Sequence, residues 1–553
     1  GIGSGEAADD ANLDLVVSNV AAVTNTGDIH LQNTGGLTVD TVDSLAGVTI
    51  TDGSNTNGGG DITIRAAGPL TVSAGDAVVN NASGNITLAA EGSDAADDLT
   101  INDAVTALGG NGNIDLLAGD TISLAAVTIS AAGTGSVLLS AGTDFNEGAA
   151  LQNGTSAGNV TLADGSTISS QDGNLTLRAP GSVQISTVNA NSNADGTAGD
   201  VIVTADFDGV ATGLSDNAGA ITEVLTGEAV NITADNLALR AATGIGSVDD
   251  LDTTVNTVAF SNGTSGNVNL TNSTGLTIGD FDGLTSSSNV GTGTTTIIAS
   301  GPITFAHSTS SDGTLTAQAI ESAATDTENI TVNAGVTVRS TAGNILFEAG
   351  DRISIAATAT VQATASAATI TLDSGFSDSD GDGSMTLDGS ISGNTTDGVV
   401  TLDLNAQQGA TQAGTGTITA DGLRLLSSGN DGSFTLGAST TNDVNTLAAN
   451  TAGAITFRDV DTLTIGTVTT VGITTSDDNV SIQTGDTLTI DDAVSIGTGR
   501  FTITSANGAT QVSGDDITAQ DLLLLGDGTF TLDSAGNDVD TFAADLEPGV
   551  ISY

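Results

Sequence analysis

The stretch GNITL, Gly84–Leu88, decides the fold, because it recurs along the chain with small changes. A glycine and an Asn or Asp come first, followed by an aliphatic, a polar and a second aliphatic residue. This alternation is typical of a half-buried β-strand, with the aliphatic pair on one side and the polar residue on the other. The Gly and the Asn or Asp predict a turn before each strand, because both residue types tolerate positive φ. Further copies are GDITI at 60–64, GNIDL at 112–116, GNVTL at 158–162, GNVNL at 266–270 and GNILF at 343–347.

A period of about 24 residues separates these units, as between Gly60 and Gly84, and is of the length typical of stacked repeats. Longer modules repeat at multiples of this period. Their matching valines, Val17, Val255, Val444 and Val539, lie about ten, eight and four periods apart. A fixed period made of strands and turns predicts a stack of coils. We therefore predict an all-β parallel β-helix (β-solenoid), right-handed as parallel crossovers usually are. It forms one continuous solenoid over 1–553, with repeats starting near 1, 232, 418 and 517.

Other folds fit the sequence less well. A β-propeller needs blades of roughly 40–45 residues with aromatic signatures, and only 2% of these residues are aromatic. A string of β-sandwich domains would show units of roughly 100 residues around a more aromatic core. The abundance of Gly, Ser and Asp and the high net charge are typical of disorder, but 38% of residues are hydrophobic and evenly spaced, which favours order.

The composition excludes several classes of partner. The chain carries 66 acidic and 8 basic residues, a formal charge of −58, and all eight basic residues are Arg. Such a charge repels nucleic acid and anionic lipid and attracts divalent cations. No Cys is present, so neither disulfides nor thiolate metal sites stabilise the fold. The longest purely aliphatic run, Leu522–Leu525, is far too short to cross a membrane.

The run ITADNLALRAATGIGSVDDLDTTVNTVAFSNGTSGNVNLTNSTGLTIGDF, Ile232–Phe281, resembles the repeat modules of bacterial filamentous-haemagglutinin-like surface proteins. The stretch that runs from GIGSGEAADDANLDLVVSNV to GDIHLQNTGGLTV at the start of the chain is a second copy. The resemblance implies a right-handed parallel β-helix, export to the cell exterior and a role in fibres, adhesion or cell–cell contact. We accordingly expect an extracellular or cell-surface location on a bacterium. The expected partners are further copies, end to end or side by side, further parts of a longer chain, or cell-surface and matrix glycans.

Calcium is the one cofactor that the sequence predicts. The stretch DSDGDGSMT, 378–386, has the D-x-D-x-D-G pattern of the first half of a calcium loop, in which alternate carboxylates converge. An acidic turn between coils is the other interpretation of this stretch. A weaker version, NSNADG, spans 191–196. The predicted metal ligands are Asp378, Asp380, Asp382, Asn191, Asn193 and Asp195. We interpret the pairs Asp280/Asp282 and Asp459/Asp461 as turn residues.

Catalysis is not expected. Carboxylate pairs are easy to find among 66 acids, so pairing carries little information. The eight Arg are scattered singly, His30 and His307 lie far apart in the sequence, and Ser and Thr occur everywhere along the chain rather than with a His partner. We predict a non-catalytic structural or adhesive fibre protein. The alternatives are a polysaccharide-binding or polysaccharide-cleaving β-helix, a calcium-dependent adhesin stalk and an ice-binding solenoid, the last because outward Thr residues could form a regular array.

The final stretch GVISY, 549–553, occupies the strand position of the module without the L-T-[IV] element that follows it elsewhere. Two interpretations remain. The sequence is either a stretch of a longer chain, or its ends are contacts by which subunits stack.

Overall fold

The computed structural model describes residues 2–3, 12–52, 59–92, 96–144, 152–153, 158–207, 218–225, 227, 229–321, 327–377, 381, 383–405, 408–427 and 432–553. Within these ranges the secondary structure is β-strand, and no helix long and apolar enough to cross a membrane is found there. The chain divides into two units of stacked coils. Unit 1 comprises 1–273 and 280–291, and unit 2 comprises 274–279 and 292–553.

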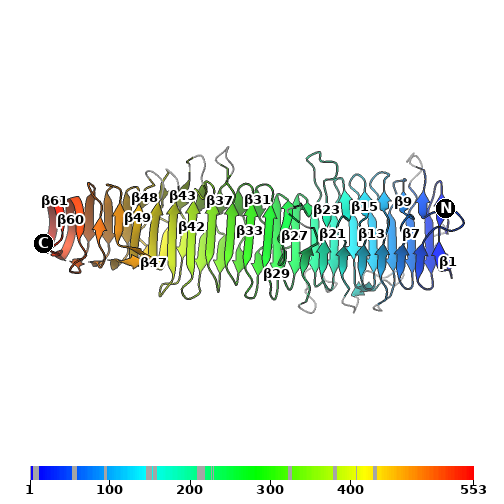
Figure 1. Cartoon of the computed structure of the whole chain (residues 1–553), viewed down its shortest axis with the longest axis horizontal. Coiled ribbons are helices and arrows are strands. Elements are labelled where there is room, and N and C mark those ends of the chain that lie inside the picture. The colour runs from blue at the N-terminus through cyan, green and yellow to red at the C-terminus, as the bar shows by residue number, and fades with distance from the viewer. Residues whose placement is uncertain are drawn as a thin grey trace. The chain divides into compact units, whose positions relative to one another are not determined.

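Each full coil of unit 1 contributes three strands to three parallel sheets, so equivalent strands lie side by side (Figure 1). The first sheet contains β4 (Ile29–Asn33), β7 (Ile62–Ala66), β10 (Ile86–Ala90) and β13 (Ile114–Ala118), paired in parallel and in register. The second contains β5 (Leu37–Val39), β8 (Leu70–Val72), β11 (Leu99–Ile101) and β14 (Ile122–Leu124). The third contains β6 (Val48–Ile50), β9 (Val78–Asn80), β12 (Val105–Ala107) and β15 (Thr128–Ala131). The predicted parallel β-solenoid is confirmed.

Unit 2 repeats this arrangement. Its longest column of short strands contains β31 (Leu276–Ile278), β34 (Ile303–Phe305), β37 (Ile330–Val332), β40 (Arg352–Ile355), β43 (Ser384–Leu387), β46 (Ala410–Thr411), β48 (Phe434–Leu436), β50 (Ile455–Asp459), β55 (Val480–Thr484) and β58 (Arg500–Ser505). A second column contains β33 (Thr295–Ala299), β36 (Leu315–Ala319), β39 (Ile345–Ala349), β42 (Thr369–Ser374) and β45 (Val399–Leu404). Two long strands, β60 (Ile517–Thr531) and β61 (Asp538–Ser552), follow.

The coil length varies around the predicted period. The turn residues Asp61, Asn85, Asn113 and Ser136 of successive coils are separated by 24, 28 and 23 positions. The next coil is longer, because Arg178, the in-register partner of Ser140, follows it by 38 positions. Extra residues are accommodated between strands while the register of the strands is kept, because a one-residue slip would turn every buried side chain outward.

The core follows directly from the alternation. In β10, Ile86 and Leu88 are fully buried and Thr87 between them faces outward. In unit 2, Phe305 and Phe347 stack with ring centroids 5.5 Å apart. Buried side chains thus pack against those of neighbouring coils, and each coil is stabilised mainly by its neighbours.

The motif glycine has the predicted positive φ at Gly266 (86°), but two other copies act differently from the prediction. Gly84 and Gly112 do not have positive φ. Instead, a Cβ on Gly84 would lie 2.1 Å from the carbonyl oxygen of Gly60, and a Cβ on Gly112 would lie 2.2 Å from that of Gly84. The glycine is required because consecutive coils approach closely at this corner, and the expected reason was wrong at these positions.

The residue after the glycine connects the coils. The Asp61 Oδ1 accepts a hydrogen bond from the Asn85 backbone N–H (2.7 Å), and the Asn85 Oδ1 accepts one from the Asn113 N–H (2.9 Å). The Asn113 Oδ1 in turn accepts one from the Ser136 N–H (2.9 Å). Each side chain therefore satisfies the turn amide of the next coil, which explains why Asn and Asp recur at this position.

Candidate functional site

The first predicted calcium loop lies largely outside the described residues, since Asp378, Asp380 and Asp382 are not among them. The second loop is described. There, the Asn193 Nδ2 donates to the Asp195 Oδ2 (3.0 Å), and the Thr197 N–H donates to the Asp195 Oδ1 (2.9 Å). The Asn191 backbone N–H donates to the Asn189 Oδ1 (2.8 Å). These bonds are those of a self-stabilised turn, and calcium binding at both loops stays a prediction.

Of the two other acidic pairs, Asp282 lies in a turn, as interpreted from the sequence, whereas Asp459 is the last residue of β50 and Asp461 lies in the bend that follows it. Asp282 has a φ of 46° and its Oδ2 accepts a hydrogen bond from Arg240 Nη1 at 2.6 Å. The Asp459 Oδ1 accepts from the Asp461 N–H (3.0 Å) and its Oδ2 from the Val444 N–H (2.9 Å). Burial raises the pKa of Asp459. The Asp459 carboxylate thus holds two backbone amides in place, and the Asp282 carboxylate pairs with the Arg240 side chain.

A buried acidic triad in unit 2 was not predicted. One carboxylate oxygen from each of Glu321, Glu328 and Asp351 lies within 4.8 Å of the other two, among the residues that the structure describes. Glu328 is 2% exposed and Asp351 is fully buried. Three converging carboxylates are the kind of oxygen donors that a hard divalent cation prefers. The triad could therefore hold a metal ion.

The fold positions the triad at one corner of successive coils. Glu328 precedes β37, and Asp351 directly precedes β40, which pairs with β37. The Glu328 N–H donates to the Asp351 Oδ2 (2.7 Å), and the Asp351 N–H donates to the Glu328 backbone oxygen (3.2 Å). A Cβ on Gly350 would lie 2.6 Å from the Glu321 Oε2, so a glycine is needed beside the triad. The signal in the sequence is the spacing of 23 positions between Glu328 and Asp351, close to one coil, rather than a loop motif.

Carboxylates also stack on the outer side of the second column of unit 2. Glu348, Asp373 and Asp403 occupy equivalent positions on β39, β42 and β45. Burial and the charge of Asp403 raise the pKa of Asp373 to about 7; the Asn405 hydrogen bond (2.6 Å) opposes this shift, and Glu348 adds to it. Burial likewise raises the pKa of Glu348 and of Asp403, the latter against the opposing charge of Arg424. This column is strongly acidic and partly desolvated.

Glu223 in unit 1 has another perturbed carboxyl group. Burial raises its pKa to about 7; an Asn231 hydrogen bond opposes the shift, and the neighbouring Asp249 and Asp252 reinforce it. A carboxylic acid that keeps its proton near neutral pH beside a second carboxylate is the arrangement used in general acid catalysis. Glu223 is therefore the acid–base candidate of unit 1.

The histidines do not join these groups. His30 lies at an outward, half-buried position of β4, with its Nε2 3.7 Å from the Asp28 Oδ2. His307 belongs to unit 2, is 5% exposed, and its backbone oxygen accepts from the Thr309 hydroxyl (3.4 Å). His30 is therefore an outward residue of its strand.

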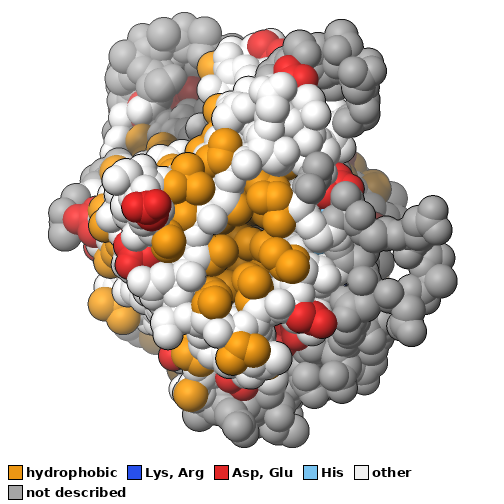
Figure 2. Space-filling view, turned by 90° about the vertical axis from the view of Figure 1, so that its right-hand side faces the viewer, with side chains coloured by type: hydrophobic (Ala, Val, Ile, Leu, Met, Phe, Trp, Pro, Cys, Tyr) orange, Lys and Arg blue, Asp and Glu red, His pale blue; other side chains and the backbone are white. Residues whose placement is uncertain are grey.

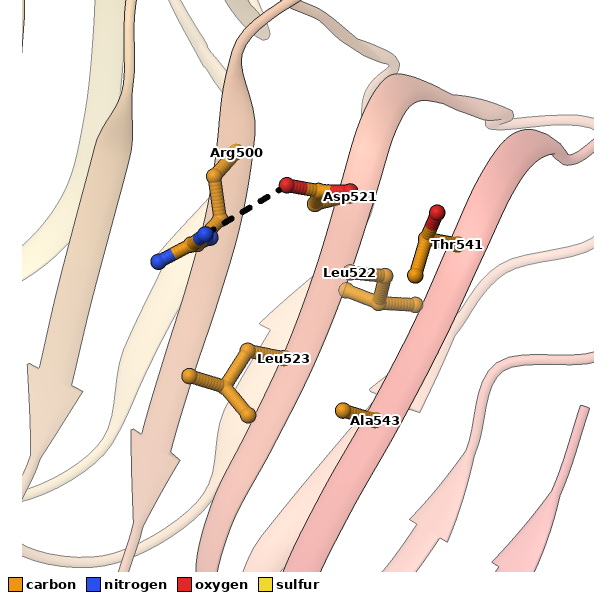
Figure 3. A pocket seen from close by; sticks show the side chains of 6 residues that line it. All are labelled: Arg500, Asp521, Leu522, Leu523, Thr541 and Ala543. Carbon is orange, nitrogen blue, oxygen red and sulfur yellow. Dashed lines mark hydrogen bonds and ion pairs between the residues drawn. The ribbon is translucent and has the colours of Figure 1, made fainter.

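A shallow groove of about 270 Å³ lies near the C-terminal end of unit 2 (Figure 3). It is lined by Arg500, Asp521, Leu522, Leu523, Thr541 and Ala543, from β58, β60 and β61. Arg500 Nη2 lies 3.4 Å from the Asp521 Oδ2, and the Arg500 side chain is 55% exposed. Leu523 and Ala543 face outward in register, so the floor of the groove is apolar.

Comparison with known proteins does not place the chain in a family. No family model, no curated protein and no solved structure matches the chain. The resemblance to filamentous-haemagglutinin-like modules therefore stays an expectation, and function has to be argued from the coils and their surfaces.

Proposed function

We propose that this chain is a non-catalytic structural or adhesive fibre protein of the bacterial cell exterior, built as a spacer of stacked β-coils. The observation that carries the proposal is the continuous in-register pairing of parallel strands within each unit, from β4 to β29 in unit 1 and from β31 to β61 in unit 2. Stability in such a stack adds up coil by coil, which suits a long load-bearing element. A charge of −58 keeps it soluble.

The proposed partners are further copies of the chain, further parts of a longer chain, and surface or matrix glycans. Hydrophobic side chains gather at the end of unit 1 that carries β1 (Leu13–Leu15) (Figure 2). Val16 is 86% exposed, and Leu13 and Val17 are also exposed. An apolar end of a coil stack favours contact with another coil.

Electron microscopy of the purified chain, with and without calcium, tests the proposal. Long unbranched filaments or bundles are the expected result. A protein that remains dispersed at high concentration under both conditions, or that turns over a polysaccharide, would contradict it.

The alternative is a polysaccharide-cleaving or polysaccharide-binding β-helix, which Glu223 and its neighbours favour. Incubation with a panel of neutral and acidic polysaccharides separates the two. Release of new reducing or unsaturated ends, abolished by Glu223→Gln, would establish the enzyme.

We further propose that calcium occupies the triad of Glu321, Glu328 and Asp351. Two of its carboxylates are buried, and one oxygen from each of the three lies within 4.8 Å of the others, as suits the oxygen donors that calcium prefers. Calcium binding should raise the free energy of unfolding by about 2.7 kcal/mol at a concentration 100 times the Kd. Differential scanning calorimetry in calcium and in chelator measures this effect.

The Glu328→Gln variant should lose the calcium-dependent gain. Glu348→Gln, which removes a carboxylate outside the triad, is the matched control and should keep it. A wild-type melting temperature that is the same in calcium and in chelator would refute the proposal for the triad and for the two predicted loops alike.

A further inference from the structure

A column of hydroxyl side chains runs along the outer side of the short strands of unit 2. At ten successive strands, β31 to β58, the outward residue is Thr or Ser, each in register with the next and each at least partly exposed to solvent. We call this surface, with the residues two before and two after each hydroxyl, the ladder face. Its hydroxyl residues are Thr277, Thr304, Thr331, Ser354, Thr386, Thr411, Thr435, Thr456, Ser481 and Thr502.

The charges of the ladder face are balanced in a very acidic protein. Acidic residues outnumber Arg 66 to 8 in the whole chain. Among the residues flanking the ten hydroxyls, three are Arg (Arg352, Arg458, Arg500) and one is acidic (Asp388), and on the two strands that continue the column Asp521 and Asp545 flank Leu523 and Ala543. The adjoining column, in contrast, stacks Glu348, Asp373 and Asp403. Two copies could therefore approach through the ladder face without the repulsion that opposes contact elsewhere.

The two ends of the ladder face differ in shape. The hydroxyl column ends beyond Thr502, where the next outward residues are Leu523 on β60 and Ala543 on β61, at the apolar groove of Figure 3. At the other end, the exposed ring of Pro302 projects two residues before Thr304. One end thus offers a hollow and the other an apolar projection.

We propose that a second copy of this chain binds the ladder face, packed face to face and antiparallel about a twofold axis parallel to the strands that passes between Thr411 and Thr435. This inference rests on the proposed fibre function and names the lateral contact within the fibre. Such an axis places β43, the strand of Asp388, opposite β50, the strand of Arg458, and any two strands equally far from the axis opposite each other. Rotation about this axis leaves the strand direction unchanged. Residues that follow the hydroxyls in one copy therefore face residues that follow the hydroxyls in the other copy.

This symmetry brings together opposite charges and no like charges. Asp388 follows the fifth hydroxyl and Arg458 follows the eighth. Asp388 of one copy therefore lies opposite Arg458 of the second copy, and Arg458 of the first lies opposite Asp388 of the second. Arg352 lies opposite Asn479, and Arg500 lies opposite Asn329, both of which can accept hydrogen bonds from a guanidinium.

The shape of the ladder face agrees with the same axis. The residues flanking the two central hydroxyls are all small: Gly409, Ala413, Ser433 and Gly437. Pro302 of the second copy lies opposite Asp521 at the side of the groove, and Thr304 lies opposite Leu523. Twelve coils spaced about 4.8 Å apart and five residues of strand give a contact of roughly 50 by 15 Å, or about 750 Å² on each partner. That is close to the roughly 800 Å² per partner of a stable interface.

The charge pair gives the test. Analytical ultracentrifugation of the full chain at physiological salt should show a dimer. Asp388→Arg and Arg458→Asp each create two like-charge contacts across the axis and should raise the dimer Kd at least about tenfold, since such contacts cost several kcal/mol. The double variant Asp388→Arg/Arg458→Asp restores both pairs and should return the Kd to near the wild-type value. Thr161→Glu, at an equivalent outward position of unit 1, is the control and should leave the Kd unchanged.

Cross-linking gives a second readout that does not depend on electrostatics. The chain has no Cys, so Asp388→Cys and Arg458→Cys each add a single thiol. Mixed and oxidised, the two variants should form a disulfide-linked heterodimer, whereas neither variant alone should cross-link efficiently.

Other results would overturn the inference. A wild-type chain that is monomeric would overturn it. So would a dimer whose Kd is unchanged by all of these substitutions. Saturable binding of a glycan to this face by the monomer would overturn it in favour of that other occupant. Filaments formed by a chain with no lateral dimer would refute the inference and leave the proposed function standing, whereas polysaccharide turnover would refute that function and leave the dimer untouched.

Discussion

Single carboxyl groups show how the acidity of this chain is tolerated. Asp373 lies between Glu348 and Asp403 in consecutive coils, and its proton is held because burial and two neighbouring carboxyl groups all disfavour its charged form. Asp459, also buried, uses both carboxylate oxygens to accept backbone amides. The same residue type therefore destabilises the fold at one position and organises a turn at another.

Asp373 should make the protein less stable as the pH rises. Its pKa is raised from 3.8 to about 7 in the folded chain, so between these values the unfolded chain has lost a proton that the folded chain keeps. Stability contributed by the neutral carboxyl is fully present below pH 4 and is lost as the pH rises through about 7. Asp373→Asn should remove this part of the pH dependence. The measurement is the melting temperature of variant and wild type at several pH values.

The control for this experiment is Asp312→Asn, which alters an acid outside the column. The difference between Asp373→Asn and wild type should widen from pH 4 to pH 8, with the variant the more stable, while Asp312→Asn should show no such widening. A difference that stays constant across this range would mean that Asp373 titrates normally.

At the scale of the strand and its turn, the sequence predicted where the strands lie, but it did not predict why glycine is required at each turn. The alternation in GNITL correctly placed Ile86 and Leu88 inside and Thr87 outside, because period-2 alternation depends only on neighbours in sequence. The role of Gly84 depends on the Gly60 carbonyl of the preceding coil, so local φ preferences could not reveal it. The triad of Glu321, Glu328 and Asp351 was missed for the same reason, since its members meet only when coils stack.

Replacing Gly84 by Ala should therefore destabilise the stack. The added Cβ would lie 2.1 Å from the Gly60 carbonyl oxygen, so the two coils must separate locally, at a cost of about 1–3 kcal/mol typical of overpacking. Gly35→Ala is the matched control, because nothing lies within 4 Å of a Cβ there. Chemical unfolding should show a loss for Gly84→Ala and almost none for Gly35→Ala. Equal effects of the two substitutions would mean that glycine is kept for chain flexibility and not for the close approach of coils.

At the scale of the whole molecule, repulsion between the acidic side chains opposes the pairing of strands in neighbouring coils. Neighbouring coils gain backbone hydrogen bonds and buried aliphatic contacts, while a formal charge of −58 spread over the chain favours expansion. Because most acids lie on the outside, this repulsion acts through water and is screened by salt. Ionic strength should therefore control both the stability of a single chain and its tendency to associate.

Raising sodium chloride from about 0.01 M to about 0.15 M shortens the Debye length from about 30 Å to about 8 Å, which is less than two coil spacings. The melting temperature should rise over this interval and level off above it, once only charges on the same coil or on neighbouring coils still interact. Glu328→Gln should respond like the wild type, because sodium screens the whole surface and does not act at the triad. Replacing sodium chloride by calcium chloride at equal ionic strength should raise the melting temperature of the wild type further, and that of Glu328→Gln less. A melting temperature that is flat between the two salt concentrations would show that coil–coil pairing alone determines stability and that the surface charge acts only between molecules.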